Sequence, residues 1–300
     1  GTELYVYYGK SDAADGQNPS DVWDSSYQGV WHFNGNLADS TAHDRDGTNY
    51  GTEETTGAIA AGRDFDGVAD YLSFGPDAGL RLSTFTVEAW FDWDSIHPAA
   101  NESYRVVLSQ GGGDGSSQHA NYQIWVNDAN QKVYGVVGFG STGSYFIADS
   151  AVDPAAQYHA ALVFDSNAGA GDLYVNGLSN DPRSGLGAAY TAGTSPFTVG
   201  EWHIPGWHYG EWDGMIDEVR VSNVVRSAAW LKFQHRNVEE ADQELAWGVE
   251  ETPDSVATIF DGQFNDIDAG SSFAGIAVVG NTANATTQGA WQYSTDSGTT

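Results

Sequence analysis

Short apolar runs, many of them alternating with polar residues, recur along the chain between segments rich in Gly, Asp, Ser and Asn. Runs of roughly four to eight residues that are bounded by such turn formers are typical of β-strands. We expect strands at residues 4–8, 30–33, 71–74, 85–93, 104–109, 122–126, 133–139, 159–164, 173–175, 197–199, 215–221 and 245–249. Many short strands with frequent turns predict an all-β protein, either a sandwich or a barrel.

Two segments refine this picture. Residues 85–91 alternate only imperfectly, which is expected of a strand that lies between two covering layers. Ser227 is a good N-cap for one convincing helix over residues 228–236, which we expect to cap the sandwich. The apolar face of this helix would consist of Trp230, Leu231, Phe233 and Gln234.

The charge balance is strongly acidic: 11 Lys and Arg stand against 41 Asp and Glu, a formal net charge of −30. Such a field repels nucleic acid and anionic membrane surfaces, and it attracts cations. Acidic disordered chains are poor in aromatic residues, whereas 13% of this chain is aromatic. The acidic residues therefore belong to the surface or to the sites of a folded protein.

The chain contains no cysteine, which excludes disulfides, zinc–thiolate sites and cysteine nucleophiles. With few lysines and many aspartates, this composition favours a bacterial extracellular protein, for which oxygen-ligated Ca²⁺ is the fitting ion. No apolar run approaches the roughly 18 residues of a membrane-spanning helix. No signal peptide opens the chain, so we expect both ends to be boundaries of a piece of a longer protein.

Four motifs follow one another in a telling order and spacing: Phe65-Asp66-Gly67-Val68-Ala69-Asp70-Tyr71, Thr84-Phe85-Thr86-Val87-Glu88-Ala89-Trp90, Leu173-Tyr174-Val175-Asn176-Gly177 and Asp213-Gly214-Met215-Ile216-Asp217-Glu218-Val219-Arg220-Val221. Together they resemble the laminin-G-like branch of the concanavalin A-like lectin/glucanase fold. The resemblance covers roughly residues 26–250. It implies an antiparallel two-sheet β-sandwich, a lectin-like jelly roll, with one short capping helix. A fold alone does not determine a function.

The flanking segments add a context. Residues 4–9 resemble the closing strand of an extracellular domain that precedes this fold in bacteria, and residues 267–296 resemble the start of a cadherin-like repeat of giant adhesins. We expect three parts: the tail of a preceding domain at 1–25, the lectin-like domain at 26–249 and a partial adhesin repeat at 250–300. The resemblance implies a large, calcium-dependent bacterial surface adhesin.

One short loop carries Asp39, Asp44 and Asp46. Their oxygens, with loop carbonyls, can surround one Ca²⁺ at about 2.3–2.6 Å, although the spacing is not that of an EF-hand. The resemblance implies a structural calcium near this loop, shared with the last long strand, where Asp217 is the natural partner. The alternative is a solvated acidic turn, because Asp favours turns.

Asp66 and Asp70 form a second candidate metal pair, but the Asp66-Gly67 dipeptide equally suits a tight turn. An ion would offset carboxylate repulsion and tie the edge of the sandwich to its N-terminal strand. We therefore expect chelation to lower the melting temperature. As in some extracellular lectins, the ion itself can alternatively bind a sugar diol.

An aromatic segment at residues 201–212 holds three Trp, one Tyr and two His. The resemblance implies a plainer Gly/Ser/Asn segment at this place, so the departure indicates a ligand site. Aromatic faces cover the apolar face of a sugar ring, and polar groups beside them bind its hydroxyls. The candidates are Trp202, His203, Trp207, His208 and Tyr209, of which Trp207 and Tyr209 would stack on the sugar. Trp202 and Trp212 flank this loop, and for these two we favour the alternative that they are core residues of the adjoining strands.

A glycine-rich loop at residues 111–121 is the second candidate. Asp114, Gln118 and Asn121 would bind sugar hydroxyls there, and Tyr145 would add another aromatic wall. The alternative is a hairpin tip without a ligand. Neither a lysine nor a helix follows the loop, so it is not a phosphate-binding motif.

Catalysis lacks a motif. The glucanases of this fold carry Glu-x-Asp-x-x-Glu on one strand, and that string is absent, as are Gly-x-Ser-x-Gly and His-Glu-x-x-His. We therefore expect a binding module and no enzyme. A purely structural spacer of the adhesin is the other alternative, against which the aromatic segment argues.

The expected function is calcium-stabilised carbohydrate binding for attachment to host-cell or biofilm glycans. We expect a secreted monomer at the bacterial cell surface, with adjoining domains of the same adhesin as neighbours. Nucleic acid and membrane insertion are not expected.

Overall fold

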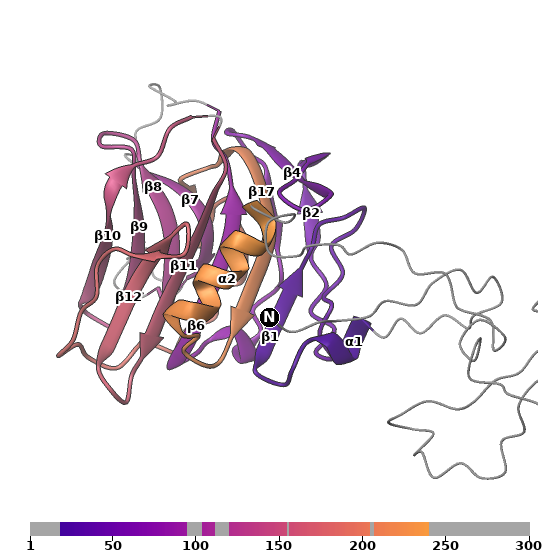
Figure 1. The fold of residues 1–300 in the computed structure, drawn as a ribbon. Helices are drawn as coiled ribbons and strands as arrows, with labels where there is room; N and C mark the ends of the chain where they lie inside the picture. Colours follow the sequence, from indigo (N-terminus) through magenta and orange to yellow (C-terminus); the bar gives the residue numbers. More distant parts are fainter. Residues whose placement is uncertain (1–18, 95–103, 112–119, 155, 205–206, 240–300) are drawn as a thin grey trace, which may run out of the picture. The chain divides into compact units, whose positions relative to one another are not determined.

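The computed structural model describes residues 19–94, 104–111, 120–154, 156–204 and 207–239, all within a compact unit that comprises residues 1–245. The described strands form two large antiparallel sheets that face each other across one core (Figure 1). This arrangement confirms the expected all-β sandwich of jelly-roll type. The expected strands at 4–8 and 245–249 and the expected adhesin repeat at 250–300 lie outside the described residues.

The larger sheet has eight strands. In spatial order they are β13 (Leu178–Ser179), β12 (Ala170–Val175), β11 (Tyr158–Asp165), β6 (Thr84–Phe91), β17 (Asp213–Ser222), β4 (Ala61–Asp66) and β3 (Glu53–Thr56), with β1 (Tyr27–Trp31) also paired to β17. The expected strand at 215–221 is the centre of β17, which joins β6 to β4 and β1.

The smaller sheet has seven strands. In spatial order they are β10 (Gly143–Ala151), β9 (Lys132–Gly138), β8 (Tyr122–Asn127), β7 (Tyr104–Gln110), β14 (Phe197–Val199), β5 (Tyr71–Ser73) and β2 (Thr48–Tyr50). A separate hairpin consists of β15 (Trp202–Ile204) and β16 (Trp207–Tyr209). The described helical elements are α1 (Pro19–Val22), the 3₁₀ turn η1 (Ala78–Leu80) and α2 (Ala228–Glu239).

The core lies between the two sheets and is rich in aromatic residues. Its largest side chains with almost no exposed surface include Trp31, Trp93, Trp212, Phe65, Phe85, Phe91, Phe164 and Phe197. Burial of large aromatic side chains is the dominant favourable contribution in such a sandwich. Trp212 is therefore a core residue, as the sequence favoured.

Strand β6 is buried on both faces, which explains its imperfect alternation. Phe85, Val87 and Phe91 enter the core, whereas Glu88 and Trp90 face the other way and are also buried. The outer face of this strand is covered by α2, which lies across the eight-stranded sheet in Figure 1.

Helix α2 begins where the sequence predicts. The backbone N–H of Trp230 donates to Oγ of Ser227 at 3.2 Å, as an N-cap requires. The expected apolar face is only partly buried: Leu231 is buried, whereas Trp230 and Phe233 are 39% and 52% exposed. The helix therefore lies on the outer face of the larger sheet and is anchored mainly through Leu231.

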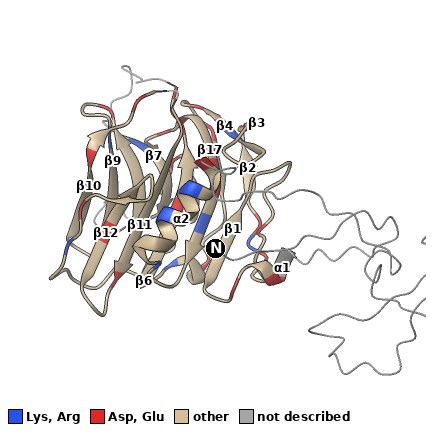
Figure 2. Cartoon of the chain, viewed as in Figure 1, with Lys and Arg blue, Asp and Glu red and all other residues tan. Residues whose placement is uncertain are grey.

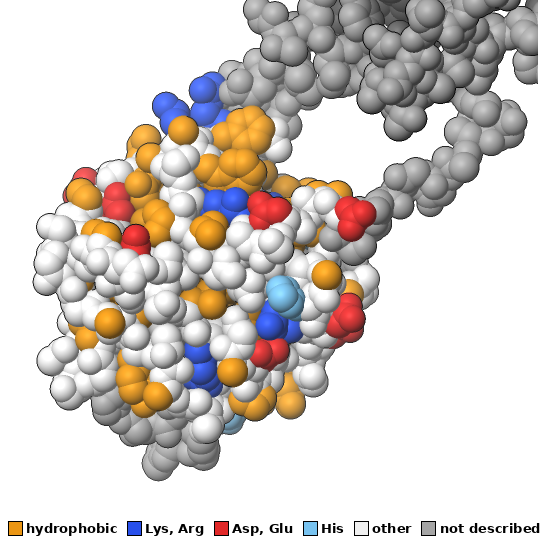
Figure 3. Space-filling model, turned by 90° about the horizontal axis from the view of Figure 1, so that it is seen from below, with side chains coloured by type: hydrophobic (Ala, Val, Ile, Leu, Met, Phe, Trp, Pro, Cys, Tyr) orange, Lys and Arg blue, Asp and Glu red, His pale blue; other side chains and the backbone are white. Residues whose placement is uncertain are grey.

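Charged residues do not form one continuous acidic field on the faces that the figures show. Acidic residues are distributed over both sheets and their connections (Figure 2), and on the face in Figure 3 their side chains form separate groups among other residues. One charge network is buried: Arg220 lies 2.6 Å from Glu218 and 3.8 Å from Glu88. None of the helices in the described part of the chain has the length and apolarity that crossing a membrane requires.

Candidate functional site

The outer face of the seven-stranded sheet carries aromatic side chains where a solvent-facing strand would usually carry polar ones. On β8, Tyr122, Ile124 and Val126 point into the core. Because side chains alternate along a strand, Gln123 and Trp125 point to the outer face. Trp125 therefore occupies the polar phase of an alternating strand, which needs an explanation other than core packing.

Trp125 is the centre of this aromatic group. Its ring is stacked on Tyr134 of β9, with centroids 4.3 Å and planes 11° apart. The ring of Tyr104 lies 5.4 Å away, and Tyr145 of β10 lies edge-on at 6.4 Å. Trp125 and Tyr134 are directly opposite in the β8–β9 register, where aromatic pairs stabilise a sheet. The rings are thus held by neighbouring strands.

Beside this group lies a hollow of ≈ 160 Å³. Its lining consists of Tyr104, Gln123, Trp125, Tyr145 and Trp202. Nε2 of Gln123 donates to Oγ of Ser109 at 3.0 Å, which fixes the amide in the lining. Four aromatic walls and one fixed amide match the usual composition of a small-molecule site.

The β15–β16 hairpin supplies one wall of the hollow. The sequence segment 201–212, expected as a loop, forms this hairpin, in which Trp202 pairs with Tyr209 and their rings lie 5.9 Å apart. Trp202 packs against Val106 of β7, and the Val106 N–H donates to the carbonyl of Gly210 at 2.7 Å. The hairpin is therefore tied to the sheet that forms the floor.

The neighbouring pair of the hairpin, His203 and His208, meets a buried carboxylate. Glu201 is 1% exposed, and its two oxygens lie 3.0 Å from Nδ1 of His203 and 2.5 Å from Nδ1 of His208. Burial raises the pKa of the Glu201 carboxyl, although both histidines act in the opposite direction. The ring of Tyr71 lies 5.9 Å from His203 and 5.3 Å from His208.

The predicted sugar-binding residues lie in different places in the structure. Trp202 and Tyr145 line the hollow, and Tyr209 packs against Trp202. His203 and His208 are bonded to Glu201. Trp207 lies in β16, but its side chain is outside the described residues, as are Asp114 and Gln118 altogether. The structure thus places part of the predicted aromatic segment at the hollow.

Asn121 has a structural role instead of the predicted sugar contact. Its side chain is completely buried, and its amide accepts from the backbone N–H of Leu82 at 2.7 Å and donates to the Leu82 carbonyl at 2.9 Å. Both hydrogen-bonding atoms of the amide are satisfied by backbone. Asn121 therefore fixes the segment before β6 and does not face a ligand.

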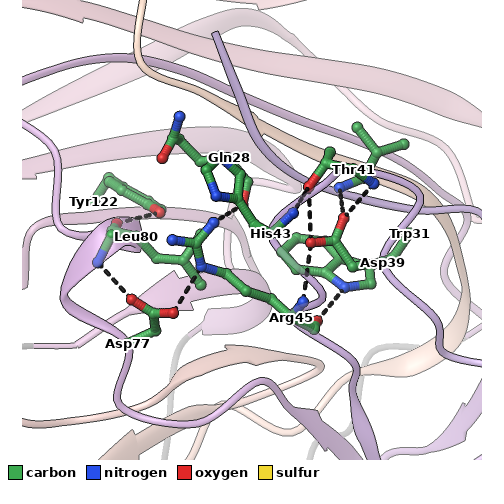
Figure 4. A network of polar contacts seen from close by, with 11 residues as sticks. Gln28, Trp31, Asp39, Thr41, His43, Arg45, Asp77, Leu80 and Tyr122 are labelled. Atoms are coloured by element: carbon green, nitrogen blue, oxygen red, sulfur yellow. Dashed lines mark hydrogen bonds and ion pairs between the residues drawn. The ribbon is translucent and has the colours of Figure 1, made fainter. Parts of the chain in front are cut away.

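The loop predicted to bind calcium is closed by hydrogen bonds of its own (Figure 4). The carboxylate of Asp39 accepts from the backbone N–H groups of Val30, Thr41 and Arg45 at 3.0, 2.9 and 3.1 Å and from the Thr41 hydroxyl at 2.9 Å. Asp46 accepts from the Asp39 N–H at 2.9 Å. These donors occupy the Asp39 oxygens that an ion would need.

The positive charge at this loop comes from Arg45. Its Nε lies 2.7 Å from Asp77, and its Nη1 donates to the carbonyl of Gln28 at 2.6 Å. Trp31 donates from Nε1 to the Arg45 carbonyl at 2.8 Å, which seats the loop on the core. Asp44 is exposed and adopts a positive φ of 54°.

Asp217 lies beneath the β3–β4 turn. It is fully buried, and Oδ2 accepts from the Ile59 N–H at 3.0 Å while Oδ1 accepts from the Glu218 N–H at 2.7 Å. Burial raises the pKa of Asp217 to about 7. Both oxygens of Asp217 thus already accept hydrogen bonds from the backbone.

The second candidate pair forms a turn. Asp66 accepts from the N–H groups of Val68 and Ala69 at 2.9 and 3.2 Å, and Asp70 accepts from the Asp66 N–H at 3.2 Å. This is the tight-turn alternative that the sequence left open. No three of the six predicted aspartates, all of which are described, have oxygens within 4.8 Å of one another. These side chains do not fit the predicted calcium sites, and calcium elsewhere stays a prediction.

Sequence reasoning missed Tyr104, Gln123 and Trp125. Each lies on a predicted strand, but the alternation of apolar and polar residues identifies a strand without showing what its outward side chains do. A tryptophan in the outward phase of β8 was the available signal.

The two-sheet sandwich and the aromatic hollow on one outer face define a lectin-like β-sandwich domain. The chain belongs to the Laminin_G_3 family of the concanavalin A-like lectin/glucanases superfamily, whose model matches residues 65–232. The family that the four sequence motifs resemble is thereby confirmed. The comparison with curated proteins finds no relative.

Solved structures share the fold. Domain 4 of AbnA, a GH43 extracellular arabinanase from Geobacillus stearothermophilus in complex with arabinotriose, matches with TM-score 0.55 and 18% identity over 69% of this chain and 97% of that domain. A Trypanosoma rangeli sialidase matches with TM-score 0.55 and 13% identity, over 76% of this chain and 36% of the sialidase. The binding domain of Paraclostridial Mosquitocidal Protein 1 matches with TM-score 0.54 and 10% identity, over 71% and 52%. This chain thus spans about a third of the sialidase. At these identities the likeness concerns the fold.

Proposed function

We propose that this chain is a carbohydrate-binding module and that its ligand site is the aromatic hollow on the outer face of the seven-stranded sheet. The observation that carries the proposal is the lining: Tyr104, Trp125, Tyr145 and Trp202 surround the amide of Gln123. Aromatic faces bury the apolar C–H face of a sugar, while the oxygen of a fixed amide accepts a hydrogen bond from a sugar hydroxyl.

The dimensions favour recognition of a single sugar ring. The hollow of ≈ 160 Å³ is smaller than the roughly 300–1,000 Å³ of sites that enclose drug-sized ligands. One residue of a polysaccharide would occupy it, and the rest of the chain would continue over the sheet. The likeness to the arabinanase domain in complex with arabinotriose supports a saccharide ligand.

Binding is favoured over hydrolysis because of what the hollow offers. Glycosidases place two carboxyl groups about 5–5.5 Å apart for retention or about 6.5–9.5 Å apart for inversion. The described residues that line the hollow are aromatic or amide side chains. The proposal is therefore a module that holds a glycan without cleaving it.

The finer proposal is attachment of a secreted bacterial surface protein to host-cell or biofilm glycans. It is supported by the sequence resemblance of the flanking segments to adhesin domains. Calcium is part of this proposal only at positions other than Asp39 and Asp217, whose oxygens accept hydrogen bonds within the protein.

The test is a glycan array followed by calorimetry on the chain and on Trp125→Ala. One face of an indole, roughly 60–80 Å² at about 25 cal/mol/Å², contributes about 1.5–2 kcal/mol, so the variant should bind about 10–30-fold more weakly. Trp230→Ala is the matched control, because Trp230 is a partly exposed tryptophan on the other sheet's outer side.

Four outcomes are possible in this experiment. Glycan binding that Trp125→Ala weakens and Trp230→Ala spares supports the proposal. Equal binding by Trp125→Ala and the unaltered chain would move the site away from the hollow. Binding to no glycan would favour the structural spacer, and release of a shortened product would establish an enzyme.

A further inference from the structure

A second ligand-type cluster lies on the β15–β16 hairpin, formed by Glu201, His203 and His208. Their ligand atoms all lie within 4.8 Å of one another. Among the described residues, this is the group of three His, Asp or Glu side chains that lie close enough to share one metal ion. The two histidines are directly opposite in the hairpin register, with ring centroids 4.8 Å apart. Nδ1 of each ring faces a different oxygen of the same carboxylate.

We propose that Glu201, His203 and His208 form a site for a divalent transition-metal ion, with zinc as the best match. In this site one carboxylate oxygen and two imidazole nitrogens converge, and the ion would take the place of the protons that bridge them. This proposal does not rest on glycan binding in the hollow.

The ligand set selects the class of ion. Two imidazoles and one carboxylate suit zinc and its neighbours in the transition series, whereas calcium requires six to eight oxygens. Zinc binds histidine nitrogen at about 2.0–2.1 Å and carboxylate oxygen at about 2.0–2.2 Å. Small adjustments would bring the three side chains from their present 2.5 and 3.0 Å separations onto one ion.

The surroundings hold the ligands in place and leave one position open. The carbonyl of Glu201 accepts from the hydroxyl of Thr198 at 2.8 Å, which fixes the start of the hairpin. Glu201 is 1% exposed, whereas His203 and His208 are 24% and 45% exposed at their side chains. Zinc with three protein ligands retains a fourth position, here on the solvent side, for water.

The cluster also has an environment that attracts cations. The formal charge of the chain is −30, which raises the local concentration of divalent ions. The ring of Tyr71, which is stacked on Tyr50 at 4.3 Å, lies beside both histidines and restricts their rotamers. An ordered pair of imidazoles loses less conformational freedom when it binds an ion.

The experiment uses the whole chain, stripped of metal with a chelator. Zinc titration in competition with a chromophoric indicator should reveal one tight site per chain. Loss of a group that only hydrogen-bonds to a metal ligand lowers metal affinity about 10–100-fold. Loss of a ligand itself, in His203→Ala or His208→Ala, should therefore lower the zinc affinity by at least about 100-fold. His43→Ala, which removes an exposed histidine of another loop, should leave it unchanged.

A spectroscopic readout keeps the test sharp if a variant folds poorly. Co²⁺ added to the unaltered chain should give the intense visible absorption of a four-coordinate site, and zinc should displace it. Imidazole ¹⁵N NMR should show ligation through Nδ1 of both rings. Fewer than one tight zinc per chain, or an equal zinc affinity in the His203→Ala/His208→Ala double variant, would overturn the proposal.

Discussion

Replacing Asp217 by asparagine should remove much of the pH dependence of stability between pH 5 and pH 8. Asp217 is fully buried, and burial raises the pKa of its carboxyl to about 7 from an ordinary value of 3.8. Between these values the folded chain holds a proton that the unfolded chain has released. The free energy of unfolding must therefore fall as the pH rises through this range.

The magnitude follows from the size of the pKa shift. Each pKa unit corresponds to about 1.36 kcal/mol, and about two units of the shift lie between pH 5 and the folded pKa of about 7. Asp217 alone should lower the free energy of unfolding by about 3 kcal/mol between pH 5 and pH 8. Asparagine resembles the protonated carboxyl in shape and cannot ionise, but its Nδ2 cannot accept one of the two backbone N–H groups that donate to Asp217. Asp217→Asn should therefore be less stable than the unaltered chain at pH 5, and this difference should shrink as the pH rises to 8.

The assay is urea unfolding at pH 5, 6, 7 and 8, followed by tryptophan fluorescence in a calcium-free buffer. Asp44→Asn is the matched control, because Asp44 is exposed and asparagine tolerates its positive φ of 54°. It should follow the pH profile of the unaltered chain. Burial also raises the pKa of Asp92 and of Asp64, so Asp217→Asn should retain a weaker slope of the same sign.

Parallel profiles for Asp217→Asn and the unaltered chain would refute this reasoning. A second measurement in millimolar calcium addresses the ion directly. If calcium abolished the pH dependence of the unaltered chain and left that of Asp217→Asn unchanged, Asp217 would be an ionised ligand after all.

Three further substitutions test roles that the hydrogen bonds assign. Asn121→Ala should cost about 1–3 kcal/mol of stability, since it leaves the backbone groups of Leu82 unpaired, and calorimetry should find glycan affinity unchanged. Asp39→Asn should lower the melting temperature by the same amount with EDTA as with calcium; a loss confined to calcium buffer would restore the metal site. Gly200→Ala should cost about 1–3 kcal/mol in denaturant unfolding, because an added Cβ would lie 2.3 Å from the Phe65 ring and φ is 87°; an unchanged midpoint would contradict this.

The sandwich could be predicted because its strands carry their own signals. β8 and β11 are short runs of mainly apolar residues, and the Ser227 cap marks the start of α2. Strands β2, β3 and β4 were not predicted as such, since their residues are mostly exposed and polar or follow turn formers. The β15–β16 hairpin gives no clear strand signal in the sequence, because each of its strands has only three residues.

The site was harder to predict because it depends on register. Tyr104, Trp125 and Tyr145 are far apart in sequence and meet only through the pairing of β7, β8, β9 and β10. The hydrogen bonds of the aspartate loop could not be predicted for a related reason. One donor to Asp39 is the backbone N–H of Val30, which the spacing of residues within the loop cannot reveal. Asp217 likewise accepts a hydrogen bond from the backbone N–H of Ile59, which is distant in sequence.

The short hairpin presents different residues on its two faces. On one face Trp202 lines the hollow and packs against Tyr209, and on the other the histidine pair lies beside the buried Glu201. A metal ion that stiffened one face would steady the wall on the other. By thermodynamic reciprocity, bound saccharide would then raise the affinity for the metal by the same factor by which bound metal raises the affinity for the saccharide. A hairpin with three residues per strand would then make the proposed saccharide binding depend on the zinc concentration.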